Sequence, residues 1–281
     1  MTQKRATPSI KRRRVGAQLR QWREAVDMPS GDVARAMGWS AARFSRVERG
    51  YYRIGRDEVI DLCAKIGVDD SKAVEEVARV AEEPTGKGWW ASYAGKVSEA
   101  YIDFVELEAE AESIRFVHPK VIPGLFQSPR YVREMHSSAR SSDPESLIAL
   151  RLARQEVLSR AQLHGLIPES AFHAEFESSP GLMKDQLRKL IDATEMDTVT
   201  LQILPLKAHP SVGSNGAMTI LTFRHPWTPV ASIDNPMGGS HTYDPAQVAY
   251  LEAEFENIAA SALPVDQSRD LLNEYLEGLH Q

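Results

Sequence analysis

Apolar residues recur at helical spacing through the first third of the chain. Val15, Leu19, Trp22 and Val26 are spaced by four, three and four positions, which places their side chains on one face of a helix. Four more short helices are predicted from similar positions: Val33, Ala34 and Met37; Phe44 and Val47; Val59, Leu62, Cys63 and Ile66; and Val74, Val77, Ala78 and Ala81. The pattern predicts a five-helix domain over 13–82, after a polar, basic arm at 1–12 that is expected to be disordered.

Turn-forming residues separate these helices. A Pro-Ser-Gly-Asp run interrupts the chain before the second helix, and Ser30 is the expected N-cap of that helix. Gly38 is expected to end it, because glycine adopts the positive φ of a helix C-terminus at little cost. Ser40 is the expected N-cap of the third helix, and Gly50 is expected to end that helix.

The pattern changes after a polar segment at 83–88, which proline and glycine mark as a linker. The remaining residues, 89–281, mix two kinds of element. Helices are predicted at 97–113, 129–137, 144–161, 183–194, 245–262 and 266–279, and strands at 172–177, 199–204, 217–223 and 230–233. The alternation at 199–203 is strict, as a half-buried strand requires. We therefore predict an all-α N-terminal domain followed by an α+β C-terminal domain.

The net charge of −6 conceals an asymmetry between these two parts. Residues 1–65 contain 15 Lys and Arg and 7 Asp and Glu, a balance of +8. The other 216 residues contain 18 and 32, a balance of −14. A basic head on an acidic body indicates a polyanionic partner for the head alone, although a basic solvated tail would give the same numbers.

The second and third helices have the spacing of a helix-turn-helix, in which the later helix enters the major groove of double-stranded DNA. They are joined by a four-residue turn centred on Gly38. The stretch 33–50, above all its closing Ser-Arg-Val-Glu-Arg-Gly run, resembles the phage-repressor-like (Cro/repressor, Xre-type) family. This resemblance implies a sequence-specific DNA-binding protein that regulates transcription.

Outward residues near the start of the third helix are expected to contact base edges: Ala41, Ala42, Arg43 and Arg46. Each arginine can donate two hydrogen bonds to guanine, worth roughly 1–3 kcal/mol of discrimination, whereas alanine offers only apolar contact. Other residues are candidates for phosphate contacts, with a solvated surface position as the alternative for each: Ser30, Ser40, Arg49, Tyr51 and Arg53. In the family, the positions of Arg23 and Glu48 often form an internal ion pair, so the resemblance implies a structural pair here.

The rest of the chain resembles the uncharacterised C-terminal domain of a large actinobacterial regulator family that includes WhiJ-like proteins. The matching segments include Val-Ile-Pro-Gly-Leu-Phe-Gln-Ser at 121–128, Arg-Leu-Ala-Arg-Gln at 151–155, and 89–90, 106–111, 131–133, 186–187 and 201–205. The resemblance implies a domain that senses a small-molecule effector or binds a small protein encoded nearby. In the second case the chain would be an antitoxin-like interaction protein that autoregulates its own operon.

Five aromatic residues are candidates for a ligand or partner groove, the alternative being ordinary core aromatics: Trp89, Trp90, Tyr101, Phe104 and Phe126. No catalytic motif accompanies them. The chain contains no Walker loop and no Gly-x-Ser-x-Gly elbow, and its eight histidines do not fall at metal-ligand spacings. Alternating glutamates at 106–112 are expected to form a solvated face. We expect no enzyme activity, no cofactor and no metal.

The sequence also bears on location and assembly. No apolar run approaches the roughly 18 residues needed to span a bilayer, and no signal peptide is recognised. The single cysteine, Cys63, cannot form an internal disulfide and is expected to be a small buried hydrophobe. We expect a cytoplasmic protein, nucleoid-associated when bound to DNA and without a membrane partner. Because one such module makes few base contacts, we also expect a homodimer on palindromic DNA.

Overall fold

The computed structural model describes residues 9–84, 87–137, 143–176, 178–208, 216–233 and 240–279. The chain divides into two compact units. The N-terminal unit contains the described residues up to Gly88 together with Phe223–Thr228, and the C-terminal unit contains those of Trp89–Thr222 and Pro229–Gln281. The expected fold class, an all-α domain followed by an α+β domain, is confirmed. In the part of the chain described, no helix has the length and apolar character needed to cross a membrane.

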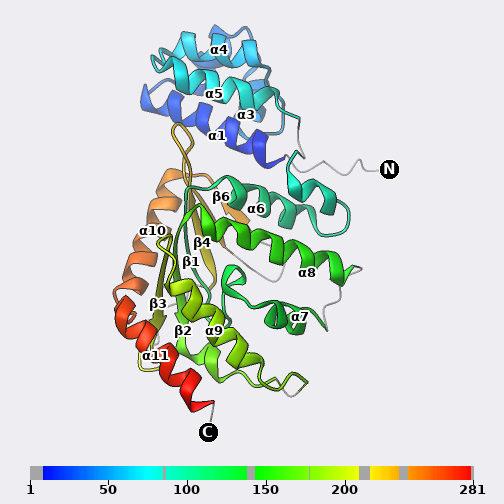
Figure 1. The fold of residues 1–281 in the computed structure, drawn as a ribbon. Coiled ribbons are helices and arrows are strands. Elements are labelled where there is room, and N and C mark those ends of the chain that lie inside the picture. Colours follow the sequence, from blue (N-terminus) through cyan, green and yellow to red (C-terminus); the bar gives the residue numbers. More distant parts are fainter. Residues whose placement is uncertain are drawn as a thin grey trace. The chain divides into compact units, whose positions relative to one another are not determined.

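The described part of the N-terminal unit contains five helices (Figure 1): α1 (Ile10–Ala25), α2 (Ser30–Ala36), α3 (Ala41–Glu48), α4 (Arg56–Ile66) and α5 (Ser71–Glu82). Their apolar faces meet in one core, in which Leu19, Phe44 and Leu62 are fully buried. Cys63 lies in the same core with 1% of its surface exposed. The helical periodicity of the sequence therefore identifies the residues that hold this unit together.

The first helix begins earlier than the sequence suggests. The expected disordered arm is wrong for residues 10–12, because α1 starts at Ile10. The Ile10 side chain is 1% exposed, and the Arg13 N–H donates to the Ser9 carbonyl over 3.1 Å. Burial of one more apolar side chain thus adds a turn at the start of the helix. Residues 1–8 of the expected arm lie outside the described residues.

Helices α1 and α3 approach each other closely at two glycines. A Cβ atom on Gly16 would lie 2.5 Å from the carbonyl oxygens of Val47 and Glu48. Gly50 ends α3 with a φ of 73°, and a Cβ atom there would lie 2.8 Å from the Arg13 backbone nitrogen. Only glycine fits at these two contacts, so the backbone of α1 directly sets the position of α3.

The described part of the C-terminal unit combines one mixed sheet with helices. The sheet has the order β3-β2-β1-β4-β5-β6, in which β1 to β3 pair in parallel and β4 to β6 continue the sheet in antiparallel fashion. The strands are β1 (Ser113–Val117), β2 (Gln162–Pro168), β3 (Val199–Leu204), β4 (Met218–Thr222), β5 (Val230–Ile233) and β6 (Ser240–Thr242). The helices are α6 (Glu99–Glu110), α7 (Pro129–Ser137), α8 (Pro144–Ala153), α9 (Leu182–Thr194), α10 (Pro245–Ala259) and α11 (Val265–Gly278).

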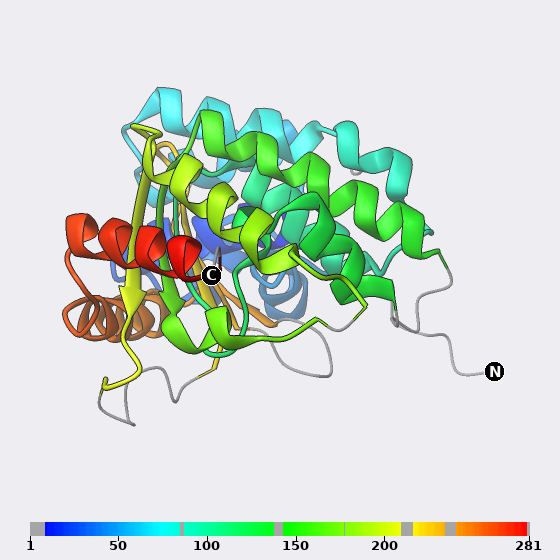
Figure 2. The same cartoon turned by 60° about the horizontal axis from the view of Figure 1, so that its bottom comes forward.

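The two faces of this sheet have different neighbours. Leu251 and Phe255 of α10 pack in one buried cluster with Val117, Ile220 and Ala231 of the strands. Figure 1 shows α10 along this face and α6 to α8 on the opposite side of the sheet. Helix α11 packs against β3 and α9 (Figure 2). Because side chains alternate along a strand, every strand contributes to both faces.

Part of the strand prediction is incorrect. Strands β1, β2 and β6 are missing from it, and the helix predicted at 144–161 ends at Ala153, where a 3-10 helix (Arg154–Ser159) follows. Strand β2 lies between two parallel neighbours and is buried at most positions, so it lacks the alternation that reveals a half-buried strand.

The strand predicted at 172–177 is also wrong. Glu169–His173 forms a 3-10 helix, residues 174–176 are irregular, and residue 177 lies outside the described residues. The two aromatic residues of this stretch have separate partners: Phe172 packs on Tyr275 and Phe176 on Tyr131, each with ring centroids 5.4 Å apart. The aromatic side chains that suggest a strand here therefore pack against two separate partners and not across a sheet.

The expected solvated face of glutamates at 106–112 is only half present, because Glu110 and Glu112 are exposed but Glu106 and Glu108 are buried. Glu106 is 5% exposed and Glu108 is 2% exposed on α6. Glu108 is buried because both of its carboxylate oxygens accept hydrogen bonds from Arg154, over 2.8 and 2.7 Å. A charge of the opposite sign far away in the sequence thus determines its environment.

Candidate DNA interface and ligand pocket

Helices α2 and α3 are joined by a tight turn. Gly38 has a φ of 65°, and the Trp39 N–H donates to the Ala34 carbonyl over 2.8 Å, which closes the end of α2. The Ser40 hydroxyl then accepts a hydrogen bond from the Arg43 N–H over 3.2 Å and caps α3 as expected. On the inner side of α3, Phe44 and Val47 are buried in the core. This leaves the opposite face of α3 available to a partner.

The outer face of α3 carries the residues expected to contact bases. Ala41, Ala42 and Arg46 are exposed, whereas Arg43 is half-buried. The Arg43 guanidinium lies 3.9 Å from the ring centre of Trp39 and donates to a carboxylate oxygen of Glu58 over 2.5 Å. Arg43 is therefore held in place from two sides before any partner binds.

Glu58 has two roles at this point of the fold. One of its carboxylate oxygens accepts from Arg43, and the other accepts from the Gly55 N–H over 3.1 Å at the start of α4. The second bond is half of a capping arrangement that fixes the first turn of α4. Sequence reasoning missed Glu58, because nothing in the local pattern links residues 43 and 58.

The remaining arginines of this face also lie against aromatic side chains. Arg46 donates to the Tyr52 hydroxyl over 3.0 Å, and its guanidinium lies 5.2 Å from the ring centre of that tyrosine. Arg49 lies 5.9 Å from the ring centre of Tyr51 and donates to the Ser45 carbonyl over 3.1 Å. These contacts restrict the rotamers of long side chains, which lowers the entropy lost on binding.

The expected phosphate contacts have mixed surroundings. Ser30 is exposed but is the first residue of α2, not its N-cap, because the cap position belongs to Pro29. Proline at that position fixes the extended backbone that precedes the helix, so no side-chain cap is made there. Ser40, Arg49 and Tyr51 are exposed near either end of α3. Arg53 is also exposed and donates to the Glu82 carbonyl over 3.1 Å.

Arg23 and Glu48 form an ion pair between α1 and α3. The Arg23 Nε donates to a Glu48 carboxylate oxygen over 2.6 Å, and the two side chains are 11% and 9% exposed. Arg23 also donates to the Met28 carbonyl over 3.0 Å. The guanidinium thus connects α1, the following turn and the last turn of α3, and it lies away from the exposed face that the other arginines share.

The five aromatics expected to line one groove are not brought together. Tyr101 and Phe104 line a cavity of about 560 Å³. Trp89 and Trp90 line a second, smaller pocket, in which Trp90 is buried. Phe126 is fully buried because Gly165 of β2, with no side chain of its own, leaves space for its ring. Two of the five residues thus belong to the larger cavity, and the alternative of ordinary core aromatics describes the buried Trp90 and Phe126.

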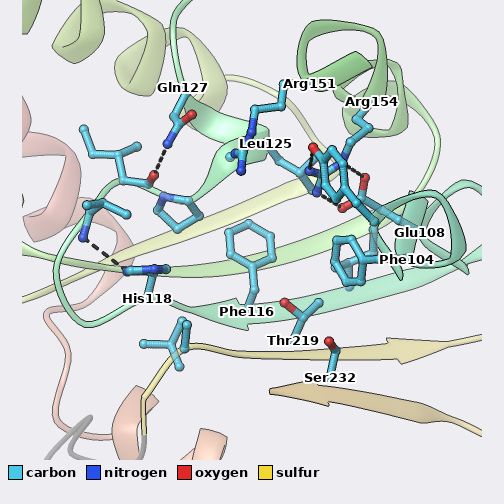
Figure 3. Close-up of a pocket in the computed structure, with 18 of the residues that line it drawn as sticks. Phe104, Glu108, Phe116, His118, Leu125, Gln127, Arg151, Arg154, Thr219 and Ser232 are labelled. Atoms are coloured by element: carbon cyan, nitrogen blue, oxygen red, sulfur yellow. Dashed lines mark hydrogen bonds and ion pairs between the residues drawn. The ribbon is translucent and has the colours of Figure 1, made fainter. Parts of the chain in front are cut away.

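The larger cavity lies between the sheet and the helices that cover it (Figure 3). Its floor is one cross-strand row, in which Phe116 pairs with Thr219, Thr219 with Ser232 and Ser232 with His241. Figure 3 shows Phe116, Thr219 and Ser232 along neighbouring strands, with Arg151 reaching into the cavity from the other side. Sequence reasoning missed this site because its residues come from many separate elements.

A buried charge network forms one wall of this cavity. Arg154 gives two hydrogen bonds to Glu108 and one to the Tyr101 hydroxyl over 2.5 Å. Burial opposes the guanidinium charge, but the neighbouring Glu108 carboxylate outweighs it and raises the pKa of Arg154. The network is a fixed ion pair rather than a titratable group.

Arg151 lies beside this network, against the same Tyr101 ring as Arg154. Its guanidinium lies 5.6 Å from the ring centre of Tyr101 and so close to Gly124 that a Cβ atom there would be 3.1 Å from its Nη1. Burial, and next the charge of Arg151, lowers the pKa of His136, which also lines the cavity. The imidazole of His136 is therefore neutral at neutral pH.

Two glutamines hold the irregular segment that borders the cavity. The Gln155 amide donates to the carbonyls of Gly124 and Gln127, over 3.2 and 2.7 Å. Gln186 donates to the Phe126 carbonyl over 2.7 Å. The segments 121–128 and 151–155, distant in sequence, thus meet at one site. Across the described residues, no group of three or more His, Cys, Asp or Glu side chains is placed to hold a metal ion.

Two regions of the chain match known protein families. Residues 14–79 match the family described as "Helix-turn-helix domain", which covers α2 to α4 and most of α1 and α5. Residues 101–274 match the family described as "Domain of unknown function (DUF5753)", which covers most of the C-terminal unit. No curated protein and no solved structure matches the chain.

Proposed function

The chain belongs to the family described as "Domain of unknown function (DUF5753)" and carries a helix-turn-helix domain, and we propose that it is an Xre-type transcription regulator that binds DNA sequence-specifically and senses a ligand through its C-terminal domain. It acts in the cytoplasm, at the nucleoid when bound to DNA, and it is not an enzyme. The observation that carries the proposal is the exposed face of α3, where Arg43, Arg46 and Arg49 each lie against an aromatic ring.

These arginines divide into two roles. Arg43 and Arg46 are three residues apart on α3, so both reach base edges when the start of this helix enters the major groove. Arg49 and Arg53 follow at the far end of the helix and suit phosphate oxygens, which fix the position of the protein on the duplex without reading sequence. The ligand-sensing part of the proposal is supported by the cavity of about 560 Å³ in the C-terminal unit.

The test is a genome-wide DNA-binding experiment with wild type, Arg43→Ala and a matched control, Arg79→Ala. Arg79 is an exposed arginine of α5 that pairs with Glu76 over 2.8 Å. We expect Arg43→Ala to lose site preference while keeping salt-sensitive, non-specific affinity, and Arg79→Ala to bind as wild type. Equal weakening of Arg43→Ala on all sequences would place Arg43 among the phosphate contacts, and no effect would remove it from the interface.

Assembly is part of the same proposal. One helix-turn-helix reads few base pairs, so the chain is proposed to act as a homodimer on sites whose half-sites lie about one helical turn apart. Sedimentation at tens of micromolar, with and without DNA, tests this. A monomer in both conditions contradicts it. Co-purification of a small protein in a one-to-one ratio would instead favour the antitoxin-like alternative.

A further inference from the structure

Two buried polar atoms line the larger cavity without a hydrogen-bond partner. Ser232 Oγ and Gln127 Oε1 have none among the described residues, although these residues are only 2% and 3% exposed. The other end of the Gln127 amide donates to the Ile122 carbonyl over 2.8 Å, which fixes the orientation of the group. Buried polar atoms are normally paired, so two unpaired ones around one cavity point to a polar occupant.

The charged groups around the cavity favour an anion. Arg151, Arg154 and Glu108 line it, and both carboxylate oxygens of Glu108 are bound to Arg154. Arg151 adds a second guanidinium to the lining of the cavity, and a guanidinium can donate hydrogen bonds to both oxygens of an anionic group. The imidazole of His118 also lines the cavity, and its Nδ1 accepts from the backbone N–H groups of 120 and 121, which fixes the orientation of the ring.

The remaining lining surface is apolar and partly flat. Phe116 lies on the floor, Phe104 stacks on His241 with ring centroids 6.1 Å apart and an angle of 8°, and Leu125 borders the other side. Figure 3 shows Phe104 beside Glu108, and Phe116 on the strand next to Thr219. The volume of about 560 Å³ falls within the roughly 300–1,000 Å³ typical of small-molecule sites.

We infer that this cavity binds a small organic anion with a planar, apolar body, whose acidic group pairs with Arg151 and whose ring system lies over Phe116 toward Ser232. The inference rests on the proposed sensing role of the C-terminal domain and gives that role a ligand class. A guanidinium in a partly desolvated site forms strong, charge-assisted hydrogen bonds with a carboxylate or sulfonate, and the flat aromatic floor selects the rest of the molecule.

The experiment compares two fluorescent probes that share one ring system and differ in charge. The anionic probe is 1-anilinonaphthalene-8-sulfonate, and the neutral probe is N-phenyl-1-naphthylamine. Both are titrated into the full-length wild type and into Arg151→Met, Arg151→Lys and Thr219→Phe. The control is Arg130→Met, which removes an exposed guanidinium of the same unit that pairs with Asp185 over 2.8 Å. Thermal midpoints accompany every titration, because partly folded chains also bind such probes.

We expect saturable, one-to-one binding of the sulfonate to the wild type and to Arg130→Met. Arg151→Met should weaken it by about tenfold or more, Arg151→Lys should restore part of the loss, and the neutral probe should change less than about twofold. Thr219→Phe, which fills the floor of the cavity, should abolish binding of both probes. Any of three results overturns the inference: the wild type shows no saturable binding, Arg151→Met weakens both probes equally, or Thr219→Phe binds as the wild type does at an unchanged thermal midpoint.

These outcomes are independent of the DNA-binding test. Probe binding is measured without DNA, and the genome-wide comparison of wild type with Arg43→Ala is made without probe. Absence of sequence-specific DNA binding by the wild type, with saturable probe binding intact, contradicts the proposed DNA-binding function alone. Absence of saturable probe binding, with specific DNA binding intact, contradicts the ligand inference alone.

Discussion

The ion pair between Arg23 and Glu48 offers a direct test of what holds α3 in place. The variant Arg23→Met removes the charge but keeps most of the length of the side chain. Glu48, which is 9% exposed, then remains as a carboxylate without its partner at 2.6 Å, and the Met28 carbonyl loses a donor. Breaking a buried pair in this way costs about 3–5 kcal/mol, and the small residual exposure of this pair favours the lower end.

A loss of about 3 kcal/mol should lower the thermal midpoint of the N-terminal unit by roughly 12–24 °C, because each kcal/mol corresponds to roughly 4–8 °C in a domain of this size. The matched control is Arg20→Met on the same helix. Arg20 pairs with Glu24 over 2.7 Å, but both side chains are more than 40% exposed. Such a surface pair contributes about 0.3–0.5 kcal/mol, so the midpoint should fall by only a few degrees.

The single cysteine provides a readout of this unit alone. Cys63 is 1% exposed in the N-terminal core, and burial raises the pKa of its thiol to about 12. It should therefore react with a thiol reagent only when the unit opens, so pulse labelling against temperature gives the required midpoint. The double variant Arg23→Met with Glu48→Met should recover most of the loss, because it leaves no unpaired charge.

Equal midpoints for Arg23→Met and Arg20→Met would refute the reasoning. If DNA affinity fell in Arg23→Met while the midpoint stayed unchanged, the residue would be a DNA contact and not a structural one. If the double variant were as unstable as the single one, the cost would come from lost packing and not from the unpaired carboxylate.

Three further predictions follow from the geometry. Glu58→Gln keeps an oxygen that can accept from the Gly55 N–H and cap α4, but it removes the charge that holds Arg43. Competition binding should show about tenfold less discrimination at one guanine, with an unchanged thermal midpoint. A uniform rise in affinity for all sequences would mean that Glu58 holds Arg43 away from DNA. The pKa of His136 is lowered in the fold, so as the pH falls the unfolded chain is protonated at this residue before the folded chain is. The urea midpoint of the C-terminal unit should therefore fall as the pH drops below about 6.5, and it should fall less in His136→Gln. The same pH dependence in wild type and His136→Gln would contradict this. Gly16→Ala should destabilise the N-terminal unit by more than about 1 kcal/mol, because the new methyl group would lie 2.5 Å from backbone oxygens. The control Gly31→Ala, where nothing lies within 4 Å of the new methyl group, should be neutral or stabilising. Similar thermal midpoints for the two variants would refute the close contact.

The sequence predicts the N-terminal unit well because its determinants are local. Apolar spacing, Ser40 as a cap and Gly38 and Gly50 as ends act within a few residues, so they can be read without knowing the fold. Strand β3 is recognised for the same reason, since its alternation reflects one buried face.

The cavity could not be predicted because its determinants are not local. Glu108 is buried through its partner Arg154, which is 46 residues away, and Ser232 faces the cavity only because β5 pairs with β4 in one register. A glutamate on a helix and a serine on a short strand carry no sign of these partners in their neighbouring residues. Only the resemblance of the segments 121–128 and 151–155 to a known family indicated that this region matters, without a geometry.

The alternation of side chains across the sheet has a consequence for how this protein can change over time. Thr219 and Ser232 face the cavity, while their chain neighbours Met218, Ile220 and Ala231 face the cluster packed by α10. Along β4 and β5, substitutions that would change the preference of the proposed site for its ligand therefore alternate with substitutions that would unfold the domain. New chemical preferences can arise by single steps along β4 and β5 without loss of the scaffold, and a deep mutational scan of these strands should show tolerance with a period of two.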